Sequence, residues 1–227
     1  MNKQSALLLL LLLAAVSGCS TRSKVARPSI EQTKVVEPVH AAVAKPAAVY
    51  TQNVREVTSK LKVVPGRWQM IICHHSALTK GNAVKYDKDH RKRGMENGLA
   101  YHFLIGNGVD SGDGEIEIGT RWIKQIKGGH VRDEAINEVA IGICLVGNLD
   151  EKQPTNNQIA ALKELLIYLR DEVVGAKVEF KVHCEADPGH TVCPGKYFPT
   201  EEMRSLFVPP PPRPQPAPAS PATSKHP

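Results

Sequence analysis

The sequence has no internal repeat, no apolar run of membrane-spanning length and few aromatic residues. Phe, Trp and Tyr together make up 5% of its 227 residues, and they are not interleaved with basic residues as on nucleic-acid-binding surfaces. The main apolar run, residues 6–16, is shorter than the roughly 20 residues that a transmembrane helix needs. These absences argue against a repeat protein, a nucleic-acid-binding protein and a protein with a transmembrane helix.

The charge balance is basic. Lys and Arg outnumber Asp and Glu by 29 to 23, which gives a formal net charge of +6. Basic proteins gather near anionic surfaces such as nucleic acid, acidic lipid and the carboxylates of a cell wall. The densest basic cluster, residues 85–93, is interpreted as a solvated loop or helix face, and a grip on an acidic polymer is the alternative.

The N-terminal residues resemble a bacterial lipoprotein signal. Lys3 precedes the apolar run, and small residues lead from it to Cys19. We expect residues 1–18 to be removed and Cys19 to be lipidated, which would tether an exported protein to a membrane. An ordinary export signal with an incidental cysteine is the alternative. Ser20 is not the aspartate that marks retention in an inner membrane, which favours an outer one.

Composition divides the rest of the chain into one domain and two extended ends. Residues 19–55 are rich in Ala and Pro and are predicted to be a flexible tether. The Pro-rich residues 208–227 are predicted to be a disordered tail. Residues 56–207 remain, and about 150 residues suffice for one hydrophobic core. We expect a monomer that binds no nucleic acid.

Short apolar or alternating runs predict five strands. They are residues 68–74, 101–105, 114–119, 140–146 and 178–183. Apolar residues at helical spacing predict one amphipathic helix between residues 159 and 173, with a capping box formed by Thr155 and Gln158 and a stop at Gly175. The pattern predicts the α/β class: a single domain with a mixed central β-sheet flanked by helices.

Two segments far apart in the sequence carry residues that suit a zinc ion (Zn²⁺). The first is Cys-His-His at residues 73–75, and the second contains His183 and Cys193. Only one of His74 and His75 can face the metal, because neighbouring residues of a strand point to opposite faces; we assign His74. Two imidazoles and one thiolate leave a fourth position open to water, as in catalytic zinc sites. Because such an ion activates water, the predicted class is a hydrolase.

The remaining histidines and cysteines are assigned structural roles. The histidines expected to be hydrogen-bonded or solvated are His90, His102, His130 and His190. Cys73, Cys144 and Cys184 lie in apolar stretches and are expected to be buried free thiols. A Cys73–Cys184 disulfide is the alternative, because an exported protein allows disulfides and both cysteines neighbour ligand histidines.

Five segments, in this order, resemble one known family. They are HHSA at residues 74–77, YHFLI at 101–105, GGHV at 128–131, IGICLVGN at 141–148, and the segment 183–195 that ends in TVCPG. Together they resemble the zinc-dependent N-acetylmuramoyl-L-alanine amidases of the phage T7 lysozyme and peptidoglycan recognition protein type. The resemblance covers residues 68–198. It implies hydrolysis of the amide bond between N-acetylmuramic acid and the L-alanine of peptidoglycan, with His74, His183 and Cys193 as zinc ligands.

The resemblance also implies roles for other residues. Tyr101 matches a catalytic tyrosine that positions or deprotonates the attacking water. Thr191 falls where phage enzymes have a lysine and recognition-protein amidases a threonine, and its hydroxyl is the weaker donor to a developing oxyanion. Gly129, His130 and His75 are assigned to the substrate groove.

One segment departs from the compact phage pattern. Residues 107–127 are longer and more acidic, and we expect them to reshape the groove; they lack the spacing of an EF-hand, so a tight turn is preferred to a calcium site. Two other classes of function stay open. They are a non-catalytic peptidoglycan-binding lipoprotein on the same fold and a structural lipoprotein without a metal. A different zinc amidohydrolase is the nearest enzymatic rival.

Overall fold

Five strands form one sheet in residues 49–208, which are the residues that this computed structural model describes. The strands are β1 (Met70–His75), β2 (Phe103–Ile105), β3 (Ile116–Ile118), β4 (Ala140–Leu145) and β5 (Glu179–Val182). Their order across the sheet is β3-β2-β4-β1-β5, and all run parallel except β3, which is antiparallel to β2. The α/β class, the mixed sheet and the existence of each predicted strand are confirmed.

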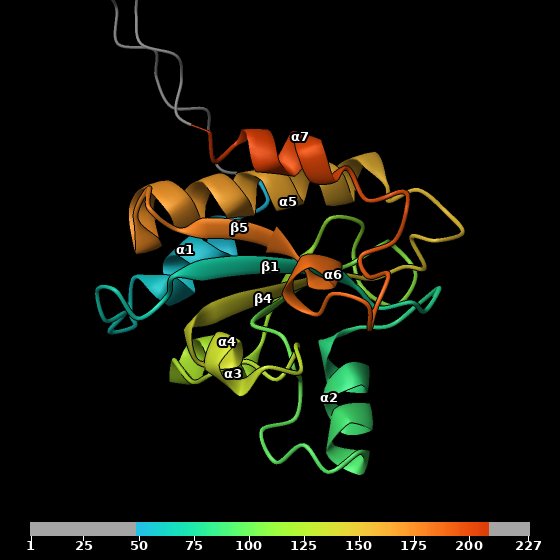
Figure 1. The fold of residues 1–227 in the computed structure, drawn as a ribbon, viewed down its shortest axis with the longest axis horizontal. Helices are drawn as coiled ribbons and strands as arrows, with labels where there is room; N and C mark the ends of the chain where they lie inside the picture. The colour runs from blue at the N-terminus through green and yellow to red at the C-terminus, as the bar shows by residue number, and fades with distance from the viewer. Residues whose placement is uncertain (1–48, 209–227) are drawn as a thin grey trace, which may run out of the picture. The chain divides into compact units, whose positions relative to one another are not determined.

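Helices pack on both faces of the sheet. They are α1 (Gln52–Thr58), α2 (Ala83–Lys92), α3 (Thr120–Lys124), α4 (Glu134–Val139), α5 (Asn156–Tyr168) with the π-helical turn η1 (Leu169–Val174), α6 (His183–Ala186) and α7 (Thr200–Ser205). In Figure 1, α5 and α7 lie above β5, β1 and β4, and α3 and α4 lie below them. Buried residues of α1, α3, α5 and α7 belong to the main core. Tyr86 of α2 belongs to a smaller cluster, and Ile136 of α4 and Ala186 of α6 pack against another.

Neighbouring residues of β1 serve opposite faces of the sheet. Ile71 and Cys73 belong to the main core with α5, whereas Ile72 packs with residues of α4 and α6. His74 follows Ile72 at a spacing of two, so its side chain lies on the same face as that of Ile72. The alternation therefore separates His74 from His75, as predicted.

Helix α5 covers the main core as the sequence predicts. The Gln158 N–H donates to the Thr155 hydroxyl, and the Thr155 N–H donates to the Gln158 side chain, which completes the capping box. Leu162 and Leu166 of the predicted stripe are fully buried, and burying each contributes about 1.5–3 kcal/mol. The helical turns end at Gly175, whose φ of 105° favours glycine.

The acidic segment 107–127 braces the start of α2. The Asp110 carboxylate pairs with Lys85 at 2.8 Å, and the Glu117 carboxylate accepts a hydrogen bond from the N–H of Ala83 at 3.0 Å. Both contacts lie in the first turn of α2, where the helix dipole favours negative charge. The basic cluster of the sequence is therefore a helix, one of the two forms predicted for it.

The folded part of the chain begins earlier than predicted. Thr51 and Val54 are fully buried, so the predicted boundary at residue 56 falls inside α1. The Glu164 carboxylate of α5 accepts hydrogen bonds from the N–H groups of Tyr50 and Thr51 at 3.1 and 3.0 Å, and from the Thr51 hydroxyl at 2.6 Å. One carboxylate thus ties the start of the domain to α5.

The ends of the chain lie outside the described residues. They include the predicted signal peptide, Cys19, most of the predicted tether and almost all of the Pro-rich tail, so anchoring through Cys19 stays a prediction. Within residues 49–208, no helix combines the length and the apolar character that crossing a bilayer requires.

Replacing Glu164 with Gln should lower the free energy of unfolding by about 1–2 kcal/mol at pH 7, because hydrogen bonds to a charged acceptor are lost. Burial raises the pKa of Glu164, but the Thr51 and Tyr50 donors outweigh it, and the net pKa lies below the usual value. The stabilisation is therefore present above the pKa of the unfolded state and is lost as the pH falls through the folded pKa.

Urea unfolding at pH 7 and pH 3 measures this effect. The difference between the wild type and Glu164→Gln should shrink at pH 3, and the exposed control Glu151→Gln should match the wild type at both. An equal difference at both pH values would contradict the role of the carboxylate charge.

Candidate metal centre

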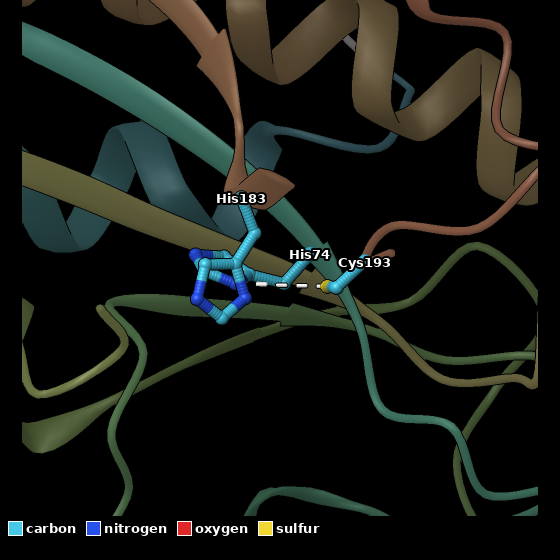
Figure 2. Close-up of side chains that lie close together, drawn as sticks. All are labelled: His74, His183 and Cys193. Carbon is cyan, nitrogen blue, oxygen red and sulfur yellow. Dashed lines mark hydrogen bonds between the residues drawn. The ribbon is translucent and has the colours of Figure 1, made fainter. Parts of the chain in front are cut away.

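The C-terminal ends of β1 and β5 bring two histidines together. These strands are parallel neighbours with Cys73 opposite Val182, and His74 and His183 are the next residues along each chain segment. The centroids of the two rings lie 4.5 Å apart, and Figure 2 shows the rings beside one another with the Cys193 sulfur next to them. The strand predicted to end on His183 ends one residue earlier, and His183 opens the short helix α6.

The loop after α6 returns Cys193 to the same place. Its Sγ lies 3.9 Å from Nδ1 of His74, and the N–H of His75 donates to this sulfur at 3.3 Å. Beyond it, Gly195 passes so close to Leu149 that a Cβ would lie 2.6 Å from the Leu149 carbonyl carbon. A glycine therefore lets the chain turn away here.

The three ligand atoms fit a zinc ion. Within the described residues, His74, His183 and Cys193 each place one ligand atom within 4.8 Å of the others. Zinc bonds of about 2.0 Å to nitrogen and about 2.3 Å to sulfur put tetrahedral ligands roughly 3.5 Å apart, so a small inward movement closes the site. Two imidazoles and one thiol with an open fourth position suit a catalytic metal better than a structural one.

Burial keeps the metal-free side chains of His74 and Cys193 uncharged. It lowers the pKa of His74 well below its usual value, and the neighbouring His130 adds to this effect. It raises the pKa of the Cys193 thiol to about 12, although the N–H of His75 acts in the opposite direction. The neutral imidazole is already the form that binds a metal, whereas the thiol has to release its proton when an ion enters.

The buried carboxylate of Asp187 contacts the second histidine, His183. This residue was not predicted from the sequence. Asp187 Oδ2 lies 2.8 Å from His183 Nε2 and accepts a hydrogen bond from the N–H of Arg132 at 3.0 Å. Burial raises the pKa of Asp187, but the bonds from Arg132 and His183 outweigh it and lower the net value. Because Nε2 is engaged, Nδ1 of His183 is left for a metal. The available signal was the spacing of four residues from His183 to Asp187.

The residues assigned to the substrate groove make contacts inside the protein. His130 is 6% exposed, and its Nδ1 lies 3.0 Å from His74 Nε2. His75 is 7% exposed, and its Nδ1 accepts a hydrogen bond from the N–H of Leu149 at 3.0 Å. Gly129 is half-buried. These contacts give both histidines structural tasks, and a contact of any of the three with substrate stays a prediction.

Tyr101 stands beside the three ligands. The centroid of its ring lies 5.2 Å from that of His74. Burial, followed by the Cys144 and Cys193 thiols, raises the pKa of Tyr101 well above its usual value, so the hydroxyl keeps its proton at neutral pH. A hollow of about 90 Å³ adjoins it, lined by Ser76, Leu78, Tyr86, Asp89, His90, Arg93 and Tyr101. A larger hollow of about 500 Å³ beside α5 and α7 includes none of the ligands.

Thr191 lies on the loop between α6 and Cys193. Its Oγ1 accepts a hydrogen bond from the N–H of Cys193 at 3.1 Å, which leaves the hydroxyl proton free to be donated. The neighbouring Val192 is 72% exposed. This loop therefore forms an exposed rim next to the ligands.

The four cysteines of the described residues are free thiols. Cys73 and Cys144 are fully buried, as expected, whereas Cys184 is only half-buried. The alternative Cys73–Cys184 disulfide is not formed in this structure. Cys184 supports the ligand loop through its backbone, because its N–H donates to the Cys193 carbonyl at 2.8 Å.

Fold and site together define an α/β protein whose parallel strands end at a His-His-Cys centre suited to a divalent metal. A family model for N-acetylmuramoyl-L-alanine amidase matches residues 65–196, which are more than half of the chain and include all three candidate ligands. The chain belongs to this family.

Similar proteins agree with this assignment. N-acetylmuramoyl-L-alanine amidase LysC from Clostridium intestinale URNW is 30% identical, with a TM-score of 0.52, over 64% of this chain and 91% of that one. Peptidoglycan recognition protein-LE in complex with tracheal cytotoxin shares the fold, with 22% identity and a TM-score of 0.51 over 64% of this chain and 85% of that one. Peptidoglycan recognition protein 3 of Mus musculus is 37% identical over 68 residues, which are 30% of this chain but 17% of that protein.

We predict that Cys193→Ala loses bound zinc, because it leaves two protein ligands. After dialysis without chelator, metal analysis should find near one zinc per chain in the wild type and almost none in the variant. Cys184→Ala is the matched control, since it removes a thiol from the neighbouring helix α6 and leaves the three ligands intact. Equal zinc content in wild type and Cys193→Ala would refute the ligand assignment.

Proposed function

We propose that the protein is a zinc-dependent N-acetylmuramoyl-L-alanine amidase that hydrolyses the amide bond between N-acetylmuramic acid and the L-alanine of peptidoglycan. The observation that carries the proposal is the centre of His74, His183 and Cys193 with Tyr101 beside it. Membership of the family supports the reaction. The names of the similar amidase and recognition proteins support peptidoglycan as the substrate.

The residues of the centre have separate tasks in this reaction. His74, His183 and Cys193 would hold the ion, which supplies Lewis-acid chemistry and lowers the pKa of bound water. Tyr101 keeps its proton at neutral pH, so it is suited to donate a hydrogen bond to the reacting water or carbonyl oxygen rather than to act as a base. Thr191 has a free hydroxyl proton and is suited to donate to the developing oxyanion.

The direct test uses purified peptidoglycan and the products that mass spectrometry identifies. We expect the protein to release free stem peptides that begin with L-alanine, and a chelator to stop this release until zinc is restored. Release of sugar fragments with intact peptide links, or release that a chelator does not affect, would refute the proposed reaction.

Tyr101→Phe should lower kcat by roughly 10²–10⁴-fold, because a positioned proton donor contributes that much to a hydrolysis step. Its zinc content should stay at the wild-type level, since Tyr101 is not a ligand. Tyr86→Phe is the matched control: this tyrosine lines the same hollow, but its hydroxyl donates to the Lys80 carbonyl at 3.0 Å. The same kcat in the wild type and Tyr101→Phe would remove Tyr101 from the mechanism.

A peptidoglycan-binding protein without catalysis is the second candidate. Peptidoglycan recognition protein 3 of Mus musculus and peptidoglycan-recognition protein SA of Drosophila melanogaster, which match part of this chain, favour it, because both are named as recognition proteins. The same assay separates the two candidates: binding to peptidoglycan with no released peptide, in a protein that holds zinc, supports recognition.

A further inference from the structure

His130 occupies a closed slot next to the candidate metal centre. Two glycines make room for its ring: a Cβ on Gly142 would come within 2.3 Å of the ring, and one on Gly128 within 2.4 Å. Gly142 lies in the middle of β4, where a glycine weakens a strand and marks a close approach. The backbone on both sides is therefore shaped around this imidazole.

A buried asparagine of α4 fixes the backbone of His130. Asn137 is 2% exposed. Its Oδ1 accepts hydrogen bonds from the N–H groups of His130 and Val131 at 3.0 and 3.3 Å, and its Nδ2 donates to the Val131 carbonyl at 2.8 Å. The protein, rather than solvent, sets where the ring of His130 lies.

The hydrogen-bond partners of the His130 ring determine which of its nitrogens donates and which accepts. Its Nε2 lies 3.4 Å from the carbonyl oxygen of Ala140, and a carbonyl only accepts, so Nε2 carries the proton. The ring of His130 is buried, and its other nitrogen lies against the imidazole of His74 rather than against a carboxylate, so the ring is neutral and its Nδ1 is an acceptor. His74 Nε2, 3.0 Å from that Nδ1, must then donate. His74 is left with a bare lone pair on Nδ1, the atom that faces Cys193 Sγ.

We propose that His130 is a positioning residue that fixes the tautomer and the ring orientation of His74, so that Nδ1 of His74 faces the metal. The inference rests on the proposed function, because it concerns the zinc ligands of that site. Its counterpart at the other histidine is Asp187, which engages Nε2 of His183.

The two ligand histidines therefore have partners of different charge. The Cys193 thiolate and the Asp187 carboxylate together balance the two positive charges of a zinc ion. A second carboxylate in place of His130 would leave an excess negative charge in a buried site, which is costly. A neutral imidazole orients His74 without adding charge.

The first experiment compares the zinc dissociation constants of three variants by competition with a chromophoric chelator. His130→Leu should weaken zinc binding by about 10–100-fold, the usual effect of removing a partner of a metal-ligating histidine. His130→Asn keeps an acceptor near the position of Nδ1 and should bind zinc within about fivefold of the wild type by the same argument. His102→Leu is the matched control, because His102 is fully buried but bonds only to the backbone of Gly142 and Ile126.

The absorption spectrum of the cobalt-substituted protein reports ligand geometry independently of activity. It should change in His130→Leu and stay unchanged in His102→Leu, even where both variants lower the stability of the metal-free fold. Unaltered zinc affinity and cobalt spectrum in His130→Leu would overturn the inference and leave His130 a packing residue.

Histidine ¹⁵N NMR of the wild type tests the inference without any variant that has to fold. We expect protonated Nε2 on both His74 and His130, with Nδ1 of His130 unprotonated, in the metal-free protein as well as in the zinc form. A proton on His130 Nδ1 would overturn the inference. A wild type that binds no zinc would refute the proposed function, and the metal-free spectrum would still decide the His74–His130 hydrogen bond.

Discussion

The parallel pairing of β1 with its two neighbours is the constraint on which the centre depends. On one side, β5 ends at Val182, opposite Cys73 of β1, and carries the chain into His183. On the other side, β4 places Gly142 opposite Ile72, and the missing side chain makes the slot for His130. A slip of one residue in β1 would turn His74 to the α5 face and separate it from both partners. The register of three strands therefore decides whether a metal can be held.

A cluster of buried histidines destabilises the fold unless each ring nitrogen has a hydrogen-bond partner. A buried polar group without a partner loses its hydrogen bonds to water, and no bond within the protein replaces them. His102 meets this condition: its Nδ1 accepts from the N–H of Gly142 at 3.0 Å, and its Nε2 lies 3.1 Å from the Ile126 carbonyl. His130 meets it through His74 and Ala140. In this cluster, Nδ1 of His74 has only the Cys193 sulfur at 3.9 Å. A metal ion bound between these two atoms, as the proposed function requires, would complete the network.

The features that the sequence predicts correctly are those that depend on residues close together in the chain. Alternation along β1 separates His74 from His75, and the leucine stripe and capping box of α5 need no information from elsewhere in the chain. The start of the domain was misplaced because Thr51 is held by Glu164, 113 residues away. His130 shows the same limit, since its partner His74 lies 56 residues away on another element.

Other parts of the site were hidden for different reasons. The helix α2 has a single buried residue, Tyr86, so the sequence contains no apolar stripe that would predict it. Asp187 precedes Pro188 and Gly189, a pattern that indicates a turn, and only the fold shows that its carboxylate reaches back to His183. Residue type and spacing therefore predict the candidate ligands, whereas the groups that would orient them are found only when the fold brings distant segments together.

The groups behind the ligands also bear on the choice between catalysis and recognition. A module that only recognises a sugar-peptide polymer needs an exposed surface. Recognition does not require a buried thiol or buried imidazoles, and burying these polar groups lowers the stability of the fold. Here Asp187 and His130 each engage one ligand histidine, and Gly128 and Gly142 leave room for the ring of His130. Orientation at this level is what a catalytic metal requires. The protonated Tyr101 beside the ligands adds a donor for the reacting atoms, which favours hydrolysis over binding alone.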